Sequence, residues 1–210
     1  MKKLILFGDS NTYGYDPRGF LGGRYPTEVR WTTHVKEALK DNYEVMEEGM
    51  NGRMLPELGY GYFTTTIQNL TKDDVFVMML GTNDILLTNH PDVEATLQRL
   101  DGILDYINQN CLARFILIAP PYISASDSEM ELYYDCSLRL NAGYMKLAQE
   151  HNINAIDAGK WNIEMGYDGV HFSINGHKKF AKSLLEVLSG ILFSAFGLRY
   201  KIGRDSATKK

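Results

Sequence analysis

One apolar run constrains the fold of this chain more than any other feature. Residues 75–80 read Val-Phe-Val-Met-Met-Leu, without a polar side chain among them. Such a run is typical of a strand in a parallel sheet, because helices cover both faces of that sheet and leave no face for polar residues. The run stops at residues 81–84, Gly-Thr-Asn-Asp. We therefore expect a buried parallel strand whose carboxyl end presents polar side chains.

Shorter runs of strand type precede and follow this one, and amphipathic segments with helical spacing separate them. The further strands are expected at residues 3–7, 43–47, 115–119 and 153–156. The helices are expected at residues 31–40, 58–70, 91–108, 129–150 and 173–193. Strands that alternate with helices predict a parallel sheet between two helical layers. We expect an α/β fold, a three-layer α/β/α sandwich whose five-stranded parallel sheet has the order 2-1-3-4-5.

The composition is that of one globular domain. The chain has 210 residues, of which 44% are hydrophobic and 23% are charged. We expect a single domain over residues 1–196, followed by a basic tail over residues 197–210. With a net charge of −4, the chain does not have the excess of basic residues that is typical of a nucleic-acid-binding protein. This charge also gives no attraction to an anionic membrane. We therefore expect neither nucleic acid nor a membrane as a partner.

The cysteines and the first residues indicate the compartment. Cys111 and Cys136 are the two cysteines of the chain, and their spacing suits neither a metal site nor a disulfide framework. Met1-Lys2-Lys3 precedes an apolar run that is too short for a secretion signal and leads directly into Gly8. We expect a cytoplasmic protein.

The strand order has a consequence for three loops. Ligands of open α/β sheets bind at the carboxyl ends of the strands. Residues 8–11, Gly-Asp-Ser-Asn, directly follow the first predicted strand and place Ser10 at such an end. In the order 2-1-3-4-5, the second and third strands flank the first one. The loops that carry Gly52, Ser10 and Asn83 are therefore expected to be neighbours.

A serine hydroxyl needs a base within hydrogen-bonding distance before it becomes a useful nucleophile. Asp168 precedes His171 by three residues. One turn of chain would bring the carboxylate to Nδ1 of the ring and leave Nε2 for Ser10. A local Asp–His pair that caps the following helix is the alternative that this spacing leaves open. The remaining histidines are expected to be structural or exposed, namely His34, His90, His151 and His177.

Acyl transfer at Ser10 would also need donors for a developing oxyanion. The candidates are the backbone N–H of Ser10, the backbone N–H of Gly52 and the side-chain amide of Asn83. Gly52 also fits a simple turn with positive φ, and Asn83 also fits a local Asx turn. The expected closeness of the three loops favours the oxyanion interpretation.

Four blocks of the sequence together resemble the SGNH hydrolases, also called the GDSL esterase family. They are residues 8–11, Gly52 within 49–53, Gly-Thr-Asn-Asp at 81–84, and Asp-Gly-Val-His at 168–171. The resemblance implies the flavodoxin-like sheet order given above. It implies that Ser10 is the nucleophile, His171 the base and Asp168 its partner. It also implies an oxyanion hole formed by Ser10, Gly52 and Asn83, with Gly49 as the alternative to Gly52.

Three further segments look like the arylesterase and acyltransferase branch of that family, namely residues 30–32, 47–49 and 79–84. The branch implies a homo-oligomer. The family implies hydrolysis of short-chain acyl or aryl esters through an acyl-serine intermediate, or acyl transfer to an alcohol. It implies no cofactor and no metal. A carbohydrate acetyl esterase and an acyl-thioesterase remain alternatives within the family.

Some polar and aromatic residues near Ser10 are expected to line a substrate pocket, namely Asn11, Tyr13, Trp31 and Tyr122. Asp9 and Asp84 are expected to brace their loops. A metal-dependent phosphoesterase is a further alternative, with hard ligands from Asp9, Asn83, Asp84, Asp168 and His171. A non-enzymatic nucleotide-binding module of flavodoxin type, with residues 8–12 around an anion, is the last alternative.

Overall fold

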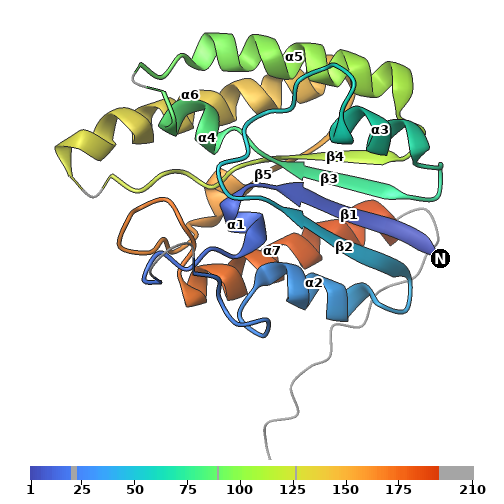
Figure 1. Cartoon of the computed structure of the whole chain (residues 1–210), viewed down its shortest axis with the longest axis horizontal. Helices are drawn as coiled ribbons and strands as arrows, with labels where there is room; N and C mark the ends of the chain where they lie inside the picture. Colours follow the sequence, from blue (N-terminus) through green and yellow to red (C-terminus); the bar gives the residue numbers. More distant parts are fainter. Residues whose placement is uncertain (20–22, 89, 126, 194–210) are drawn as a thin grey trace, which may run out of the picture.

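The sheet is parallel throughout and has the order β2-β1-β3-β4-β5, as predicted (Figure 1). The computed structural model describes residues 1–19, 23–88, 90–125 and 127–193. Its strands are β1 (Lys2–Gly8), β2 (Tyr43–Gly49), β3 (Val75–Met79), β4 (Arg114–Ala119) and β5 (Asn154–Asp157). The register places Gly8 opposite Gly49 and Met79, so the three strand ends lie side by side.

Helices cover both faces of this sheet. They are α1 (Ser10–Tyr13), α2 (Trp31–Leu39), α3 (Tyr62–Asn69), α4 (Thr82–Leu86), α5 (Val93–Asn110), α6 (Ser128–Glu150) and α7 (Ile174–Phe193), with a 3₁₀ helix η1 (Ala158–Trp161). In Figure 1, α2 and α7 lie below the sheet, and α3, α5 and α6 lie above it. The three-layer α/β/α sandwich is therefore confirmed.

The side chains of the central strands alternate between two apolar cores. Leu4 and Leu6 of β1 pack in the core that α2 and α7 cover. Ile5 and Phe7 pack in the core that α3, α5 and α6 cover. Because residues 4–7 of β1 and all of β3 are buried on both faces, they read as continuous apolar runs. This burial holds the strand ends, and the loops that follow them, in fixed positions.

The sequence predicted a helix from residue 58, but α3 begins at Tyr62. Gly59 and Gly61 precede it, and glycine disfavours a helix interior because its backbone loses the most freedom on folding. The short helices α1 and α4 were not predicted, because four or five residues carry no periodicity. Each of these helices begins within three residues of the end of a strand. They therefore set the direction in which Ser10 and Asn83 leave the sheet.

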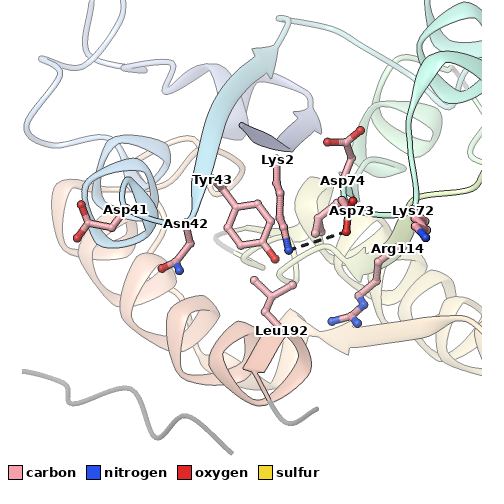
Figure 2. A pocket seen from close by; sticks show the side chains of 10 residues that line it. Lys2, Asp41, Asn42, Tyr43, Lys72, Asp73, Asp74, Arg114 and Leu192 are labelled. Atoms are coloured by element: carbon pink, nitrogen blue, oxygen red, sulfur yellow. Dashed lines mark ion pairs between the residues drawn. The ribbon is translucent and has the colours of Figure 1, made fainter. Parts of the chain in front are cut away.

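A pocket of about 370 Å³ lies at the amino ends of the strands (Figure 2). Its lining is polar and of mixed charge, from Lys2, Asp41, Asn42, Tyr43, Lys72, Asp73, Asp74, Val75, Arg114 and Leu192. The Lys2 ammonium and the Asp73 carboxylate are 3.9 Å apart. Since Ser10 and Asn83 follow the carboxyl ends of their strands, this pocket is separate from the candidate site.

The predicted basic tail at residues 197–210 lies outside the described residues and stays a prediction. Within the described ranges, none of the helices combines the length and the apolar character that crossing a membrane requires.

Candidate active site

Ser10 is the first residue of α1, one residue after the end of the interior strand β1. Asp9 caps this helix, since its Oδ1 accepts from the backbone N–H of Asn11 at 2.9 Å. Burial raises the pKa of the Asp9 carboxyl to about 6, although this hydrogen bond opposes the shift. The predicted bracing role of Asp9 therefore has a structural basis. As the first helical residue, Ser10 also has a backbone N–H without a partner within the helix.

His171 lies against Ser10 on a loop that returns from β5. Its Nε2 is 2.9 Å from Ser10 Oγ, and its Nδ1 is 2.6 Å from Asp168 Oδ2. The other oxygen of Asp168 accepts from the backbone N–H groups of Val170 and His171, each at 3.0 Å. Burial raises the pKa of Asp168, but the hydrogen bonds from His171 and the two N–H groups outweigh it, so the net pKa is lowered. Asp168 therefore stays ionised and fixes the ring.

The capping alternative for Asp168 and His171 is not what the structure shows. Helix α7 is capped by Ser173, whose Oγ accepts from the backbone N–H of Gly176 at 3.0 Å. The Asp168 carboxylate instead faces the imidazole and the turn before it. Asp168 and His171 are thus directed toward Ser10 and not toward the helix.

Neighbouring segments support the loop that carries His171. The ring of Tyr15 lies 4.4 Å from the His171 ring, between centroids. The backbone N–H of Ser124 donates to Gly169 O at 2.8 Å. The hydroxyl of Tyr167 donates to Pro17 O at 2.6 Å. In Figure 1 this orange segment lies next to the blue segment around α1.

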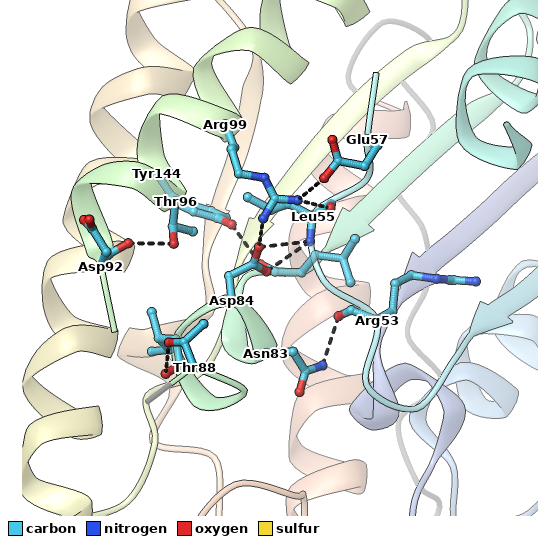
Figure 3. A network of polar contacts seen from close by, with 12 residues as sticks. Arg53, Leu55, Glu57, Asn83, Asp84, Thr88, Asp92, Thr96, Arg99 and Tyr144 are labelled. Atoms are coloured by element: carbon cyan, nitrogen blue, oxygen red, sulfur yellow. Dashed lines mark hydrogen bonds and ion pairs between the residues drawn. The ribbon is translucent and has the colours of Figure 1, made fainter. Parts of the chain in front are cut away.

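Asn83 lies in the first turn of α4, at the end of β3. Its Nδ2 donates to Arg53 O at 2.9 Å, and the NH₂ group carries a second N–H for another acceptor (Figure 3). The helix follows Gly81, which has a φ of 114° and no room for a side chain, because a Cβ would lie 2.3 Å from the Tyr144 hydroxyl. Gly81 thus allows the chain to turn sharply from β3 into the helix that carries Asn83.

Gly52 and Gly49 have different structural roles. A Cβ on Gly49 would lie 2.1 Å from the backbone nitrogen of Tyr13, so the end of β2 packs directly on α1. Gly52 has a φ of 72° and is exposed, and a Cβ there would meet only Leu87 Cδ1 at 3.9 Å. Gly49 is therefore needed for packing. The open position of Gly52 favours it as the source of an oxyanion-hole N–H.

Arg53 joins the three strand-end loops, and the sequence had given it no role. Its Nη1 donates to Gly8 O at 2.9 Å and to Glu48 O, and its guanidinium lies 4.1 Å from the centroid of the Phe7 ring. Burial lowers its pKa. Since Arg53 O also accepts from Asn83, this one residue contacts the ends of β1 and β2 and the start of α4.

Asp84 stabilises the neighbouring loop at Leu55, which agrees with the predicted bracing role (Figure 3). Its carboxylate accepts from the backbone N–H of Leu55 at 3.0 Å and from Arg99 Nη1 at 2.8 Å. Arg99 Nη2 donates to Leu55 O at 2.6 Å. Burial raises the pKa of Asp84 although both donors oppose the shift. The contribution of Arg99 could not be predicted, because nothing in the sequence distinguishes it from the other polar residues of α5.

The pocket prediction was wrong for Trp31, and for Asn11, which is about as buried as Ser10, it stays a prediction. Trp31 is 1% exposed and packs on Phe180, with ring centroids 4.9 Å apart. Its residue type suggested a binding surface, but α2 turns the indole toward α7. Asn11 is buried too, and its side chain contacts the backbone on both sides of His171.

Tyr13 and Tyr122 are half-buried, and their role in a pocket stays a prediction. The Arg24 guanidinium lies 4.3 Å from the centroid of the Tyr13 ring. The rings of Tyr122 and Tyr134 pack edge to face, with their centroids 6.4 Å apart. Among the described residues, the ring of Tyr15 packs on His171, and the sequence could show only that Tyr15 lies near Ser10 in the chain.

The carboxylates named for the phosphoesterase alternative are engaged within the protein. Asp9 caps α1, Asp84 binds Arg99 and Leu55, and Asp168 binds His171. Across the described ranges, no group of three or more His, Cys, Asp or Glu side chains is arranged to hold a metal ion. The geometry therefore favours the serine mechanism over metal chemistry.

A serine, a histidine and an aspartate in hydrogen-bonded series, at the carboxyl edge of a doubly wound sheet, define a serine hydrolase of α/β type. The profile of the GDSL-like lipase/acylhydrolase family matches residues 6–179, and the chain belongs to this family. The expected resemblance is thereby confirmed, and with it the class of serine carboxylic-ester hydrolases.

Solved structures with the same fold cover nearly the whole chain. An aryl esterase from M. smegmatis has 21% identity and a TM-score of 0.76, with 90% of this chain and 99% of that chain covered. The carbohydrate acetylesterase Est24 from Sinorhizobium meliloti has 21% identity and a TM-score of 0.75, with 91% and 100% covered. A lipolytic G-D-S-L family member from Veillonella parvula has 23% identity and a TM-score of 0.72, with 90% and 99% covered. Comparison with curated proteins gave no match.

Proposed function

We propose that this protein hydrolyses short-chain acyl or aryl esters through an acyl-serine intermediate. The observation that carries the proposal is the hydrogen-bonded series from Ser10 Oγ through both nitrogens of His171 to Asp168. A serine becomes nucleophilic when a base accepts its proton, and a third group holds that base in the correct tautomer. Family membership supports an ester as the substrate class.

In the first half-reaction, Ser10 Oγ attacks the carbonyl carbon while its proton passes to His171 Nε2. The Asp168 carboxylate accepts from Nδ1–H and stabilises the imidazolium. The backbone N–H groups of Ser10 and Gly52 and the side-chain amide of Asn83 donate to the oxyanion. Collapse of the tetrahedral intermediate breaks the bond to the alcohol, whose oxygen takes the proton from His171.

In the second half-reaction, water attacks the acyl-serine with His171 again as the base. The acid leaves, and Ser10 regains its proton. An alcohol that competes with water gives an ester instead, so the same residues support acyl transfer. The balance depends on which nucleophile reaches the acyl-serine first.

Small acyl groups fit the compact chain. It aligns over almost the full length of an aryl esterase and a carbohydrate acetylesterase, without a large added segment. The side chain of Leu87, next to Gly52, is 61% exposed, so this side of the site is open to solvent. An acylated sugar is the second candidate substrate, because the fold of a carbohydrate acetylesterase matches equally well.

A substrate panel tests the proposal. Aryl acetates and butyrates, acetylated sugars and acyl-thioesters are assayed with and without a competing alcohol, and Ser10→Ala serves as the control. We expect fastest turnover of short aryl esters and no effect of a chelator. Activity that a chelator abolishes and a divalent metal restores would contradict the serine mechanism. Thioesters or acetylated sugars as the best substrates would select the alternative within the family.

Two further expectations belong to the same proposal. A homo-oligomer is expected, and light scattering of the purified protein tests it. A cytoplasmic location is expected, and fractionation of the source cells tests it. Neither expectation enters the mechanism above.

A further inference from the structure

The side chain of Asn11 contacts the backbone on both sides of His171. Its Nδ2 donates to Val170 O at 3.1 Å, and its Oδ1 accepts from the backbone N–H of Phe172 at 2.9 Å. Asn11 is 161 positions from Phe172 and directly follows Ser10 in sequence. One amide therefore joins the residue after the nucleophile to the two peptide groups that flank the base.

The backbone of Asn11 is itself held in place. Its N–H donates to Asp9 Oδ1 at 2.9 Å, and its carbonyl accepts from the indole N–H of Trp31 at 2.9 Å. The residue is 6% exposed. Every polar group of Asn11 thus has a partner, and α1, α2 and the His171 loop meet at this residue.

We propose that Asn11 is a positioning residue, which sets the separation of Ser10 Oγ and His171 Nε2 through these two hydrogen bonds. The inference rests on the proposed ester hydrolysis. Of the two peptide groups that flank His171, the His171 N–H bonds Asp168, whereas Val170 O and Phe172 N–H bond Asn11. Asp168 therefore orients the ring, and Asn11 fixes the distance of the ring from the nucleophile.

An apolar residue at position 11 would leave Val170 O and Phe172 N–H without these partners. A buried polar group without a partner costs more free energy than a lost hydrogen bond contributes, so the loop would shift to reach water. A displacement of about 1 Å between reacting groups lowers a rate about 10²-fold. The effect is expected in kcat, because the side chain of Asn11 is buried and holds the backbone around the base.

The test compares Asn11→Leu and Asn11→Asp with the wild type. Leucine removes both hydrogen bonds at similar volume, and aspartate keeps only the acceptor for Phe172 N–H. The control is Asn141→Leu, since Asn141 is 2% exposed and its Nδ2 donates to Pro120 O at 2.7 Å and not to the backbone beside His171. The readouts are kcat, KM, the pH dependence of kcat/KM and the thermal midpoint.

A further readout is independent of any substrate. The proton between His171 Nδ1 and Asp168 Oδ2, at 2.6 Å, is expected to give a downfield ¹H resonance in the wild type. In Asn11→Leu the loop shifts toward water, so this proton exchanges faster with solvent, and we expect the resonance to broaden or disappear well below the thermal midpoint. In Asn141→Leu we expect the resonance to persist at a temperature equally far below that variant's own thermal midpoint.

The expected result is a kcat about 10- to 100-fold lower in Asn11→Leu, with KM within about threefold and a displaced pH profile. In Asn11→Asp we expect a loss at least as large, because a buried carboxylate then faces Val170 O. An unchanged kcat and an unchanged resonance in a folded Asn11→Leu would overturn the inference, even if the wild type is an active esterase. Equal losses in Asn141→Leu would also overturn it. If the wild type hydrolyses no ester, the proposed function fails, and the resonance alone decides whether Asn11 positions His171.

Discussion

Ser10 Oγ and His171 Nε2 lie 2.9 Å apart, although 161 positions separate the two residues in the chain. This distance is within the range in which a hydroxyl donates its proton to an imidazole. Ser10 is held by β1 and α1, whereas His171 lies on the segment between η1 and α7. The chemistry of the protein depends on keeping these two segments together.

Replacement of Ser10, the proposed nucleophile, is the most direct test of this relationship. Ser10→Ala removes the attacking oxygen, so turnover of a short aryl ester should fall by about 10⁴-fold or more. Alanine suits the first position of a helix, so the circular dichroism spectrum should match that of the wild type. Substantial residual turnover that a fresh preparation reproduces would assign the reaction to another residue.

Asn83→Ala tests the oxyanion hole. If the amide acts mainly in the transition state, kcat should fall by about 10²–10³-fold while KM changes little. The variant also removes the donor to Arg53 O, so Arg53→Met serves as a control for loop disorder. A large rise in KM at constant kcat would instead place Asn83 in substrate binding.

Gly49→Ala and Gly52→Ala separate packing from catalysis. At position 49 the new Cβ would collide with the backbone of Tyr13, so we expect a loss of about 3 kcal/mol or more in the free energy of unfolding. At position 52 the space is open and only the positive φ is strained, which costs about 1 kcal/mol. Urea unfolding measures both values. Gly52→Ala should also lower kcat, and a fully active, folded variant would remove Gly52 from the oxyanion hole.

His177 and Asp9 should make stability depend on pH in opposite directions. Burial lowers the pKa of His177 from 6.5 to about 4, so between these values the unfolded chain binds more protons and stability rises with pH. Burial raises the pKa of Asp9 from 3.8 to about 6, so there the folded protein binds more protons and stability falls as pH rises. Each contribution is about 3 kcal/mol, and the two nearly cancel.

Single variants should therefore expose the two slopes. Between pH 4 and 6.5, urea unfolding of Asp9→Asn should show stability that rises with pH more steeply than in the wild type. His177→Gln should show stability that falls with pH relative to the wild type. Asparagine can still cap α1, so the first variant tests charge and not capping. Parallel pH curves for all three proteins would contradict both pKa shifts.

Local patterns were sufficient for much of the site. The apolar runs located the strands, and the glycines and polar residues at their ends located the loops that carry Ser10, Gly52 and Asn83. The short spacing of Asp168 and His171 was also readable, because one carboxylate reaches both the ring and the backbone N–H groups of a single turn. These features depend on residues that are close in sequence.

The supporting contacts could not be predicted in the same way. Arg53 reaches Gly8 O across 45 positions, Arg99 reaches Leu55 O across 44, and Asn11 reaches Val170 O across 159. Such pairs leave no periodicity in the sequence. The direction of a side chain was equally hidden, which is why Trp31 was expected in the pocket and lies in the interior.

By itself, the sequence determined the five strands, the five longer helices and the residue types at the candidate site, because hydrophobic periodicity and residue type act over short stretches of chain. The alternation of strands with helices favoured the sheet order that the structure shows. Only the tertiary structure decided that His171 lies against Ser10, that Gly49 packs on α1 while Gly52 stays open, and that Asn11 joins the helix of Ser10 to the loop of His171. Those outcomes depend on hydrogen bonds and close packing between distant segments, and such contacts exist only once the chain has folded.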